Sequence, residues 1–521
     1  MPIRARNWLT PAAWVAAVAA LLLLVFPLGF PNYDTIYSLL WGRELAEGLS
    51  PDRGAALPPT PHPLTELWGL ATSPLGNGAI DLTMIGAYVS LGLIGYLVYR
   101  LGSLWFDRPI GAVAALIVLT RAPFLSNGLR AYIDLPYIAL VLAALVIETK
   151  RPRAGWPVLA LLALAGLLRP EAWLFSFAYL AYLLLDVERP REDHEREKEG
   201  GVPLERADTQ KRGLIRPRFV RARGTPSSPL LLAALALAGP ILWAIFDWVT
   251  AGSPTYSFTG TRETVETLER QTGPVDLILY GPRRLGEVLQ WPGMVAAAGG
   301  VLIAAAIAFR SRKWKLSTPY EGAKLAIGLA AAVLALGAFA VLACAGLAII
   351  PRYTMLAAAL LAIFAAFALL GWRVLGPGHP WRRPWQAFAV VVALMFVAWA
   401  PNQYDLLSRV DTDLTNQSEI ESDLGDLADS GAFEPVCLPI SVPNHRAVPR
   451  LAFDLDLRPS RIVSASEQRQ PRRGYFLDPA SPFVIHNFIL DPNDPARITT
   501  VVPPGFRRVA GNESWLLYRR C

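Results

Sequence analysis

The residues with the clearest chemical potential are charged side chains beside long apolar runs. Four arginines and three acids share this position: Arg121, Arg130, Arg169, Arg352, Asp34, Asp134 and Glu171. Charge is costly near lipid, so ionisable groups at this depth usually have a function. Guanidinium groups bind phosphate through paired hydrogen bonds, and a neighbouring carboxylate can accept a proton from a reacting hydroxyl. The set predicts a site that binds an anionic head group and leaves a carboxylate for chemistry.

Each of these residues also has a purely structural interpretation. Long basic side chains can extend from a membrane boundary to water, and opposite charges can tie helical hairpins together. The segment LLRPEAWLF, in which Arg169 precedes Glu171 by two residues, favours such a pair. Asp34 could cap the amphipathic helix (Ile36, Leu39, Leu40 and Leu45) that we expect to begin directly after it, lying along the membrane surface. We still favour Asp34 as the catalytic residue, because it directly follows the first apolar run.

The elements that must position these residues are membrane spans. The chain has 521 residues, of which 53% are hydrophobic and only 17% charged, and its mean hydropathy is +0.35. Apolar runs of about 20 residues, the length that crosses a bilayer core, recur along most of it. This pattern excludes a disordered chain, a disulfide scaffold and a cytosolic enzyme. We expect eleven helical spans, at about 11–30, 79–99, 109–125, 135–148, 156–168, 172–186, 230–249, 293–309, 325–350, 353–371 and 386–401.

Basic residues in the short loops predict the orientation of these spans. They gather in alternate loops, at 100–108, 150–153, 310–324 and 373–383. Because cytoplasmic loops are rich in Lys and Arg, we expect a multi-pass plasma-membrane protein with its N-terminus inside and its C-terminus outside. The net charge is +7, but the basic residues lie in these loops, so we expect no nucleic-acid partner.

The longer loops then divide between the two sides of the membrane. The loops 31–78 and 250–292 should be external. The mixed-charge segment 187–229 has almost no apolar content, so we expect a disordered cytoplasmic loop there.

The tail 402–521 has a different pattern from the membrane domain 1–401. A helical stretch is followed by short apolar runs, among them PVCLPISV, RLAFDLDL and SWLLYRR. This predicts a small extracytoplasmic α/β domain, which we expect to hold or guide an acceptor without carrying the catalytic base. Cys437 and Cys521 could pair if the tail faces an oxidising compartment, but two cysteines do not decide the matter.

Four segments together resemble the integral-membrane GT-C glycosyltransferases, over about residues 1–400. These enzymes include protein O-mannosyltransferases, lipid A aminoarabinose transferases and bacterial lipid-dependent mannosyl- and arabinosyltransferases. Asp34 matches the aspartate after their first span, and AYIDLPYIAL resembles their second acidic position. GLLRPEAWLF resembles their short outer turn, and IIPRYTMLAAALLAI looks like the late Arg-Tyr motif near the donor phosphate. Thr35 follows Asp34 where two branches usually have Asp-Glu, so the sugar stays open.

The resemblance implies that a sugar moves from a polyprenyl-phosphate donor to an extracytoplasmic acceptor hydroxyl. The acceptor would be a glycan, a lipid or a protein, and membrane lipids would surround the enzyme. Asp34 would act as base in a single inverting displacement, and Asp134, at the second acidic position, would be a second catalytic residue. Five further residues would contact substrate, the first two at the donor phosphate: Arg352, Tyr353, Arg130, Arg169 and Glu171.

His62 and Glu66, in PTPHPLTELWG of the first external loop, could contact substrate or bind a metal. Only five histidines are scattered along the chain, which disfavours a histidine metal site. A divalent ion held by carboxylates, as in some relatives, is still open. No phosphate-binding glycine loop is visible, and a lipid-linked donor needs no nucleotide site. We therefore expect no cofactor.

The main alternative is a multispan transporter or flippase for a lipid-linked or anionic substrate. Such a protein should have charges deep in its spans, or broken helices in matched halves. The charges here lie at the outer boundary instead, and no internal repeat of fixed period is evident. An enzyme should bring Asp34, Asp134 and Arg352 into one outward-facing cavity, whereas three separate lipid-facing positions would exclude that interpretation.

Overall fold

The computed structural model describes residues 6–26, 29–185, 228–310, 322–434, 437–488 and 498–521. Most of the segment 187–229, which we expect to be a disordered loop, lies outside these residues. The N-terminal part is helical: α1 (Arg6–Val25), α2 (Tyr33–Ala46), α3 (Pro63–Thr72), α4 (Gly78–Trp105), α5 (Arg108–Leu119), α6 (Ala122–Gly128), α7 (Asp134–Lys150), α8 (Trp156–Gly166), α9 (Glu171–Leu184), α10 (Pro229–Ala251), α11 (Tyr256–Thr267), α12 (Gly273–Arg310), α13 (Gly322–Cys344), η2 (Pro351–Thr354), α14 (Met355–Leu370) and α15 (Arg382–Asp429).

Six helices among the described residues are long and apolar enough to cross a membrane: α4, α10, α12, α13, α14 with its flanking turns, and α15. The pair α5 and α6, bent by 64° at their junction, adds a seventh if it is one broken span. The shorter apolar helices include α8 and α9. Each of the eleven expected spans overlaps one of the observed helices, and the number of membrane crossings stays a prediction.

Helix α14 forms the centre of the helical part. Its sequence, MLAAALLAIFAAFALL, is apolar on every side, and all residues from Met355 to Ala368 are buried. A helix without a polar face is stable only when other elements surround it. Gly300 of α12 allows this close packing, because a Cβ there would overlap the carbonyl group of Phe364. The turn η2, which carries Arg352, leads directly into this fixed helix.

The tail contains a five-stranded sheet with two helices. Its strands are β1 (Ile440–Val442), β2 (Ile462–Ser464), β3 (Gly474–Pro479), β4 (Arg507–Gly511) and β5 (Trp515–Arg520), and its helices are α16 (Val448–Asp454) and α17 (Pro482–Phe488). The strand order is β2-β1-β3-β5-β4. Strand β1 is parallel to β2 and β3, whereas β5 is antiparallel to β3 and β4. A disulfide joins Cys437 to Cys521, with a Cα–Cα distance of 5.9 Å.

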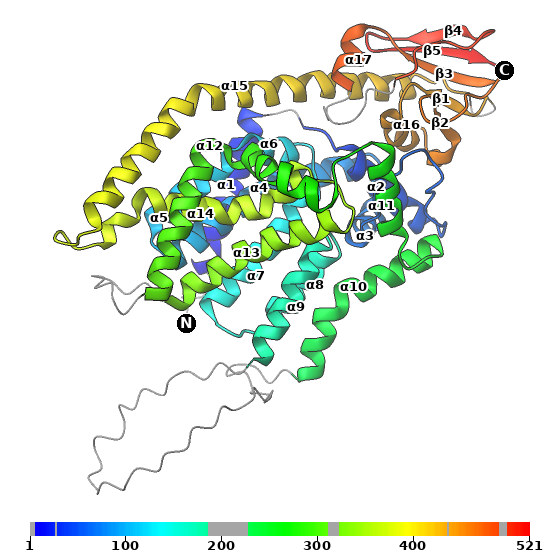
Figure 1. Ribbon diagram of the computed structural model, residues 1–521. Helices are drawn as coiled ribbons and strands as arrows, with labels where there is room; N and C mark the ends of the chain where they lie inside the picture. The colour runs from blue at the N-terminus through cyan, green and yellow to red at the C-terminus, as the bar shows by residue number, and fades with distance from the viewer. Residues whose placement is uncertain (1–5, 27–28, 186–227, 311–321, 435–436, 489–497) are drawn as a thin grey trace, which may run out of the picture.

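Two details of the tail differ from the sequence pattern. RLAFDLDL alternates like a strand, yet most of it belongs to α16, because its residues Leu451, Ala452 and Phe453 are all buried against neighbouring elements. The predicted boundary at 401/402 lies inside α15, which is 48 residues long and ends at Asp429. Figure 1 shows α15 running along the helical part and on to the sheet.

Helix α2 is a core element, because protein covers most of its residues from Thr35 to Glu44. Its expected position along the membrane surface stays a prediction. Ile36, Leu40 and Trp41 belong to the same buried cluster as Leu424 and Leu451 of the tail. Helix α3 packs against α2 as well, and α16 contacts it from the tail (Figure 1). Apolar residues at helical spacing indicate that a face is covered, but not whether lipid or protein covers it.

Two glycines set the distance between α2 and α3. A Cβ at Gly42 would overlap backbone atoms of Gly69 and Leu70, and a Cβ at Gly69 would overlap the carbonyl of Ser38. We expect Gly42→Ala to lower the free energy of unfolding by about 1–3 kcal/mol, because the helices must separate. Thermal unfolding of the purified protein measures this. Gly86→Ala in α4 is the control, since nothing lies within 4 Å of its added Cβ. Equal loss in both variants would contradict the close helix contact.

Candidate active site

A cavity of about 1280 Å³ lies where the helical part meets the tail. Seven of the nine predicted site residues line it: Asp34, His62, Arg130, Arg169, Glu171, Arg352 and Tyr353. Asp134 is buried behind Arg169, and Glu66 is buried beneath the first loop. Arg121 lies elsewhere and donates to the carbonyl of Ile117, one turn earlier. The segments that the sequence analysis singled out therefore meet at one cavity, although not every side chain faces it.

The cap of α2 is Asn32, which leaves the carboxylate of Asp34 free of that structural role. The Asn32 side-chain oxygen accepts from the backbone N–H of Asp34 at 2.8 Å and of Thr35 at 3.3 Å. Its amide group donates to the carbonyl of Arg130 at 2.7 Å, which fixes the start of α2 against a segment 98 residues away. Asp34 then lies in the first turn of α2, where the helix dipole favours a negative charge.

Asp34 and Arg352 form an ion pair inside the cavity. The Nη1 of Arg352 donates to Oδ2 of Asp34 at 3.0 Å, and each side chain is 22% exposed. The guanidinium group also lies over the rings of Tyr132 and Tyr353, at 5.2 and 5.4 Å. Burial opposes ionisation of Asp34, but the charge and hydrogen bond of Arg352 outweigh it and hold the pKa of Asp34 below its ordinary value. The carboxylate is therefore ionised near neutral pH, as a general base must be.

Arg169 has two acidic partners. Its Nη1 donates to Asp134 and its Nη2 to Glu171, both at 2.6 Å, and all three side chains are buried. Its guanidinium group also lies 4.2 Å from the ring centre of Tyr353. The pairing of Arg169 with Glu171 is the structural role that the sequence left open. Asp134 faces Arg169, so its predicted catalytic role requires a rearrangement of this cluster.

His62 faces the cavity but is held as a neutral ring. Burial, followed by the charges of Arg169 and Arg352, lowers its pKa to about 3 against the opposing effect of Asp34. Its ring packs edge-on against Trp243, with ring centres 5.6 Å apart. A neutral imidazole can accept or donate a hydrogen bond to substrate. His62 therefore adds a polar contact without adding charge.

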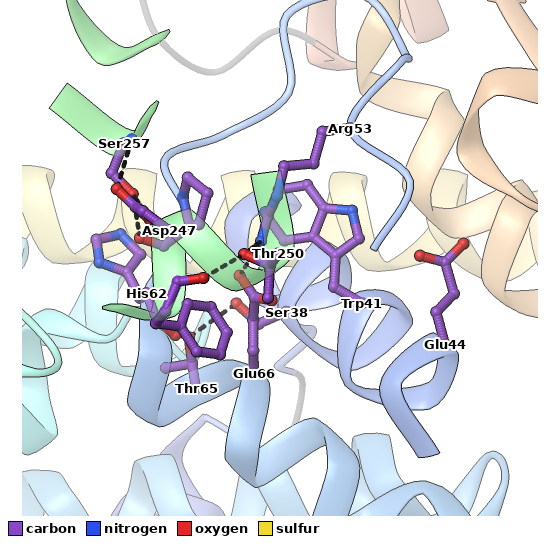
Figure 2. A network of polar contacts seen from close by, with 12 residues as sticks. Ser38, Trp41, Glu44, Arg53, His62, Thr65, Glu66, Asp247, Thr250 and Ser257 are labelled. Carbon is purple, nitrogen blue, oxygen red and sulfur yellow. Dashed lines mark hydrogen bonds and ion pairs between the residues drawn. The ribbon is translucent and has the colours of Figure 1, made fainter. Parts of the chain in front are cut away.

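Glu66 belongs to a separate polar network under the first loop (Figure 2). Arg53 donates from Nη2 to both carboxylate oxygens of Glu66 and to Thr250, each at 3.2 Å. The guanidinium group of Arg53 also lies over Trp41, 4.4 Å from the ring centre. The network therefore ties the segment between α2 and α3 to both of these helices and to α10. Glu66 holds these elements together and does not face the cavity, which corrects its expected contact with substrate.

The described residues contain no group of three or more His, Cys, Asp or Glu side chains arranged to hold a metal ion. The cavity does contain charged or polar residues that the sequence analysis did not single out: Arg270, Arg283, Arg284, Glu287, Gln417, Glu421, His445 and Arg446. Arg283 and Arg284 come shortly before an expected span, so the search for charged residues beside apolar runs could have found them. Nothing in the local sequence marks Gln417, Glu421, His445 and Arg446 as site residues, because only the tertiary structure brings them to the cavity.

No protein-family model matches the chain, and no curated protein sequence matches it. The fold is similar to the crystal structure of ArnT from Cupriavidus metallidurans bound to undecaprenyl phosphate, with a TM-score of 0.52 and 13% identity over 98% of both chains. A likeness to the archaeal oligosaccharyltransferase AglB from Archaeoglobus fulgidus has a TM-score of 0.40 and 12% identity, over 87% of this chain and 64% of that one. The chain therefore shares the fold of that ArnT structure over nearly its whole length, which is the fold that the family resemblance predicts.

The raised pKa of Glu66 leads to a prediction of how the stability of the folded protein depends on pH. Burial raises its pKa from 4.5 to about 7, against the opposing charge of Arg53. Between these values the folded protein binds a proton that the unfolded chain lacks, so stability falls as pH rises from 4.5 to 7. Glu66→Gln removes this dependence and should lose less stability between about pH 5 and about pH 8.

Thermal unfolding at the two pH values measures the effect. Glu263→Gln, which changes an exposed acid on α11, is the matched control and should keep the wild-type profile. Identical profiles for wild type and Glu66→Gln would contradict the assignment.

Proposed function

We propose that this protein is a membrane glycosyltransferase that moves a sugar from a polyprenyl-phosphate donor to an acceptor hydroxyl outside the membrane. The observation that carries the proposal is the contact between Asp34 and Arg352 in one large cavity. This contact puts a base and a phosphate-binding group side by side. The ArnT fold supports the same activity, because the ArnT structure that it matches holds undecaprenyl phosphate.

The proposed reaction is a single displacement at the anomeric carbon of the sugar. Asp34 accepts the proton of the acceptor hydroxyl while the acceptor oxygen bonds to that carbon. The bond between the carbon and the phosphate oxygen breaks, and its electron pair stays on the polyprenyl phosphate. Asp34 then releases the proton to water. Because no enzyme nucleophile takes part, the configuration at the anomeric carbon inverts.

Arg352 is the best candidate for binding the donor phosphate. Its Nε is buried and has no hydrogen-bond partner among the described residues, so the guanidinium group has a donor to offer beyond the one used for Asp34. Arg169 is less suited, since two acids already accept from it. A guanidinium group held at the leaving phosphate stabilises the charge that develops there.

The part of the cavity lining that α9, α10 and α13 provide includes several apolar side chains, which suit a prenyl chain. Leu174 and Phe177 of α9, Pro240 of α10, and Ala338 and Val341 of α13 all line it. Phe177 and Val341 are exposed, at 41% and 59%. Apolar surface of this kind is stabilised when a hydrocarbon chain covers it. A lipid-linked donor would therefore place its chain along these helices and its phosphate at Arg352.

Asp34→Asn tests the base directly. The change keeps the size of the side chain and leaves the Asn32 cap intact, so folding should be unaffected. We expect sugar transfer to fall by about 10² or more, the effect of losing a positioned base. The measurement is transfer by purified protein from a panel of polyprenyl-phosphate sugars. Asp81→Asn, at the exposed first turn of α4, is the matched control.

Asp134→Asn should cost less activity than Asp34→Asn, because Asp134 already accepts from Arg169. If Asp134→Asn is inactive while Asp34→Asn transfers at the wild-type rate, the two roles are exchanged. Near wild-type transfer by both variants would contradict the proposed site. Movement of a lipid-linked substrate across vesicles without sugar transfer would favour the transporter alternative.

Arg352→Lys tests the phosphate anchor. Lysine keeps the charge but loses the paired hydrogen bonds of guanidinium, so we expect donor affinity to fall by about tenfold. Binding of a polyprenyl phosphate to the purified variant measures this, without need of an acceptor. Arg373→Lys, which changes an exposed ion pair with Asp107 far from the cavity, is the control. Unchanged affinity in Arg352→Lys would remove Arg352 from the donor site.

A further inference from the structure

The tail forms one wall of the cavity, and four of the seven tail residues that line the cavity are polar. Gln417 and Glu421 of α15 and His445 and Arg446 near β1 line the cavity together. The ring of His445 packs edge-on against Tyr33, with ring centres 5.5 Å apart. Since Tyr33 directly precedes Asp34, this wall reaches the proposed base. It differs in chemistry from the apolar wall on α9, α10 and α13.

Gln417 and Glu421 point two buried oxygen atoms at this end of the cavity. They are four residues apart on α15, so their side chains lie on one face of the helix. Gln417 is only 6% exposed, and its Nε2 donates to the carbonyl of Asn487 at 2.9 Å, which fixes the orientation of the amide. Among the described residues, Gln417 Oε1 and Glu421 Oε2 have no hydrogen-bond partner.

Two buried acceptors without donors are unfavourable in a folded protein, at a cost of about 1–3 kcal/mol each. Such a cost is compensated when a ligand supplies hydrogen-bond donors. The ligand that fits here must carry at least two donors, because the two oxygens lie one helical turn apart. Hydroxyl groups of a sugar ring and the ammonium group of an amine are the two chemical classes that qualify.

The neighbouring charges favour hydroxyl groups over ammonium. Arg446 lines the same wall, and its positive charge acts on Tyr33 and Tyr132. Near Glu421, the positive charges of Arg450 and Arg446 are opposed by the negative charge of Asp454. Arg130 lines the cavity as well, and it too acts on Tyr132. These guanidinium groups would repel a cation. A hydroxyl group can instead donate to Gln417 or Glu421 and accept from an arginine at the same time.

We propose that Gln417 and Glu421 form a subsite for the hydroxyl groups of a neutral sugar, which in the proposed reaction belongs to the acceptor. The term acceptor rests on the proposed function, whereas binding of the sugar does not. The position supports the assignment, since a sugar on this wall lies on the Tyr33 side of Asp34, and the apolar wall is left for the donor lipid. The acceptor would thus be a glycan or a glycosylated molecule.

Binding of simple glycosides to the full-length protein tests the subsite without any donor. The probes are the methyl glycosides of mannose, glucose and arabinose, with glucosamine as the cationic comparison. The protein is held in lipid nanodiscs, because the sugar head groups of maltoside detergents would compete. Saturation-transfer NMR reports which probe contacts the protein, and titration gives its affinity. The test variant is Gln417→Leu with Glu421→Ala, and the control is Glu419→Ala, an exposed acid on the same helix.

We expect at least one neutral glycoside to bind the wild type and the Glu419→Ala protein equally, and to bind the double variant about tenfold more weakly after the loss of two hydrogen bonds. Each single variant should lose part of that affinity, which keeps the test valid if the double variant does not fold. Equal binding to wild type and double variant would overturn the subsite, as would the absence of binding by every neutral glycoside. Tighter binding of glucosamine would assign the site to an amine instead.

The same measurement separates this proposal from the proposed function. The glycoside titration compares the wild type only with variants of Gln417, Glu421 and Glu419, so its result does not depend on the role of Asp34. If Asp34→Asn transfers sugar normally, the proposed base is wrong while the glycoside result still decides the subsite. If transfer depends on Asp34 but the tail variants bind every probe normally, the subsite alone is wrong.

Discussion

The ion pair between Asp34 and Arg352 joins two segments that are 318 residues apart in sequence. The packing around each segment holds the pair in place. Arg352 is fixed because its turn leads into the wholly buried helix α14. Asp34 is fixed because α2 is held between α3 and the tail and its first turn is docked on the backbone of Arg130. A carboxylate and a guanidinium group in partial burial attract each other strongly only when both are kept at this distance. The surrounding packing therefore determines the electrostatics of the cavity.

The buried charges divide into a closed set and an open pair. Arg169 is matched by Asp134 and Glu171, so its donors already have acceptors inside the protein. Asp34 and Arg352 are more exposed and face the cavity. Such a division has a physical advantage, since the closed set provides a rigid base and the open pair can exchange its partner for a substrate group. The proposed anchoring of a phosphate at Arg352 and proton transfer to Asp34 both depend on that exchange.

The tail is integrated with the helical part and shares its core. Helix α15 passes without a break from the apolar region into the tail, and the tail residues Leu424 and Leu451 pack in one cluster with Ile36 and Trp41 of α2. As a result, the tail supplies a wall of the cavity next to Tyr33. A polar wall from the tail and an apolar wall from α9 and α13 give the two proposed substrates different surfaces.

Much of this arrangement is determined by local sequence. Apolar runs of spanning length predicted where the helices lie, and the order of Asp34, Arg169 and Arg352 along the chain predicted the fold that the match to ArnT confirms. Hydrophobic spacing is a local property, however, and does not identify the element that covers an apolar face. That is why α2 was expected to be an amphipathic helix although protein covers most of it, and why the alternation in RLAFDLDL did not reveal helix α16. The pairing of Arg169 with Asp134, the role of Glu66 beneath the first loop, and the arrival of Gln417 and Glu421 at the cavity were decided only by tertiary structure. Each of these depends on distances between segments far apart in the chain, and hydrogen bonds and ion pairs form only when those distances are within a few ångströms.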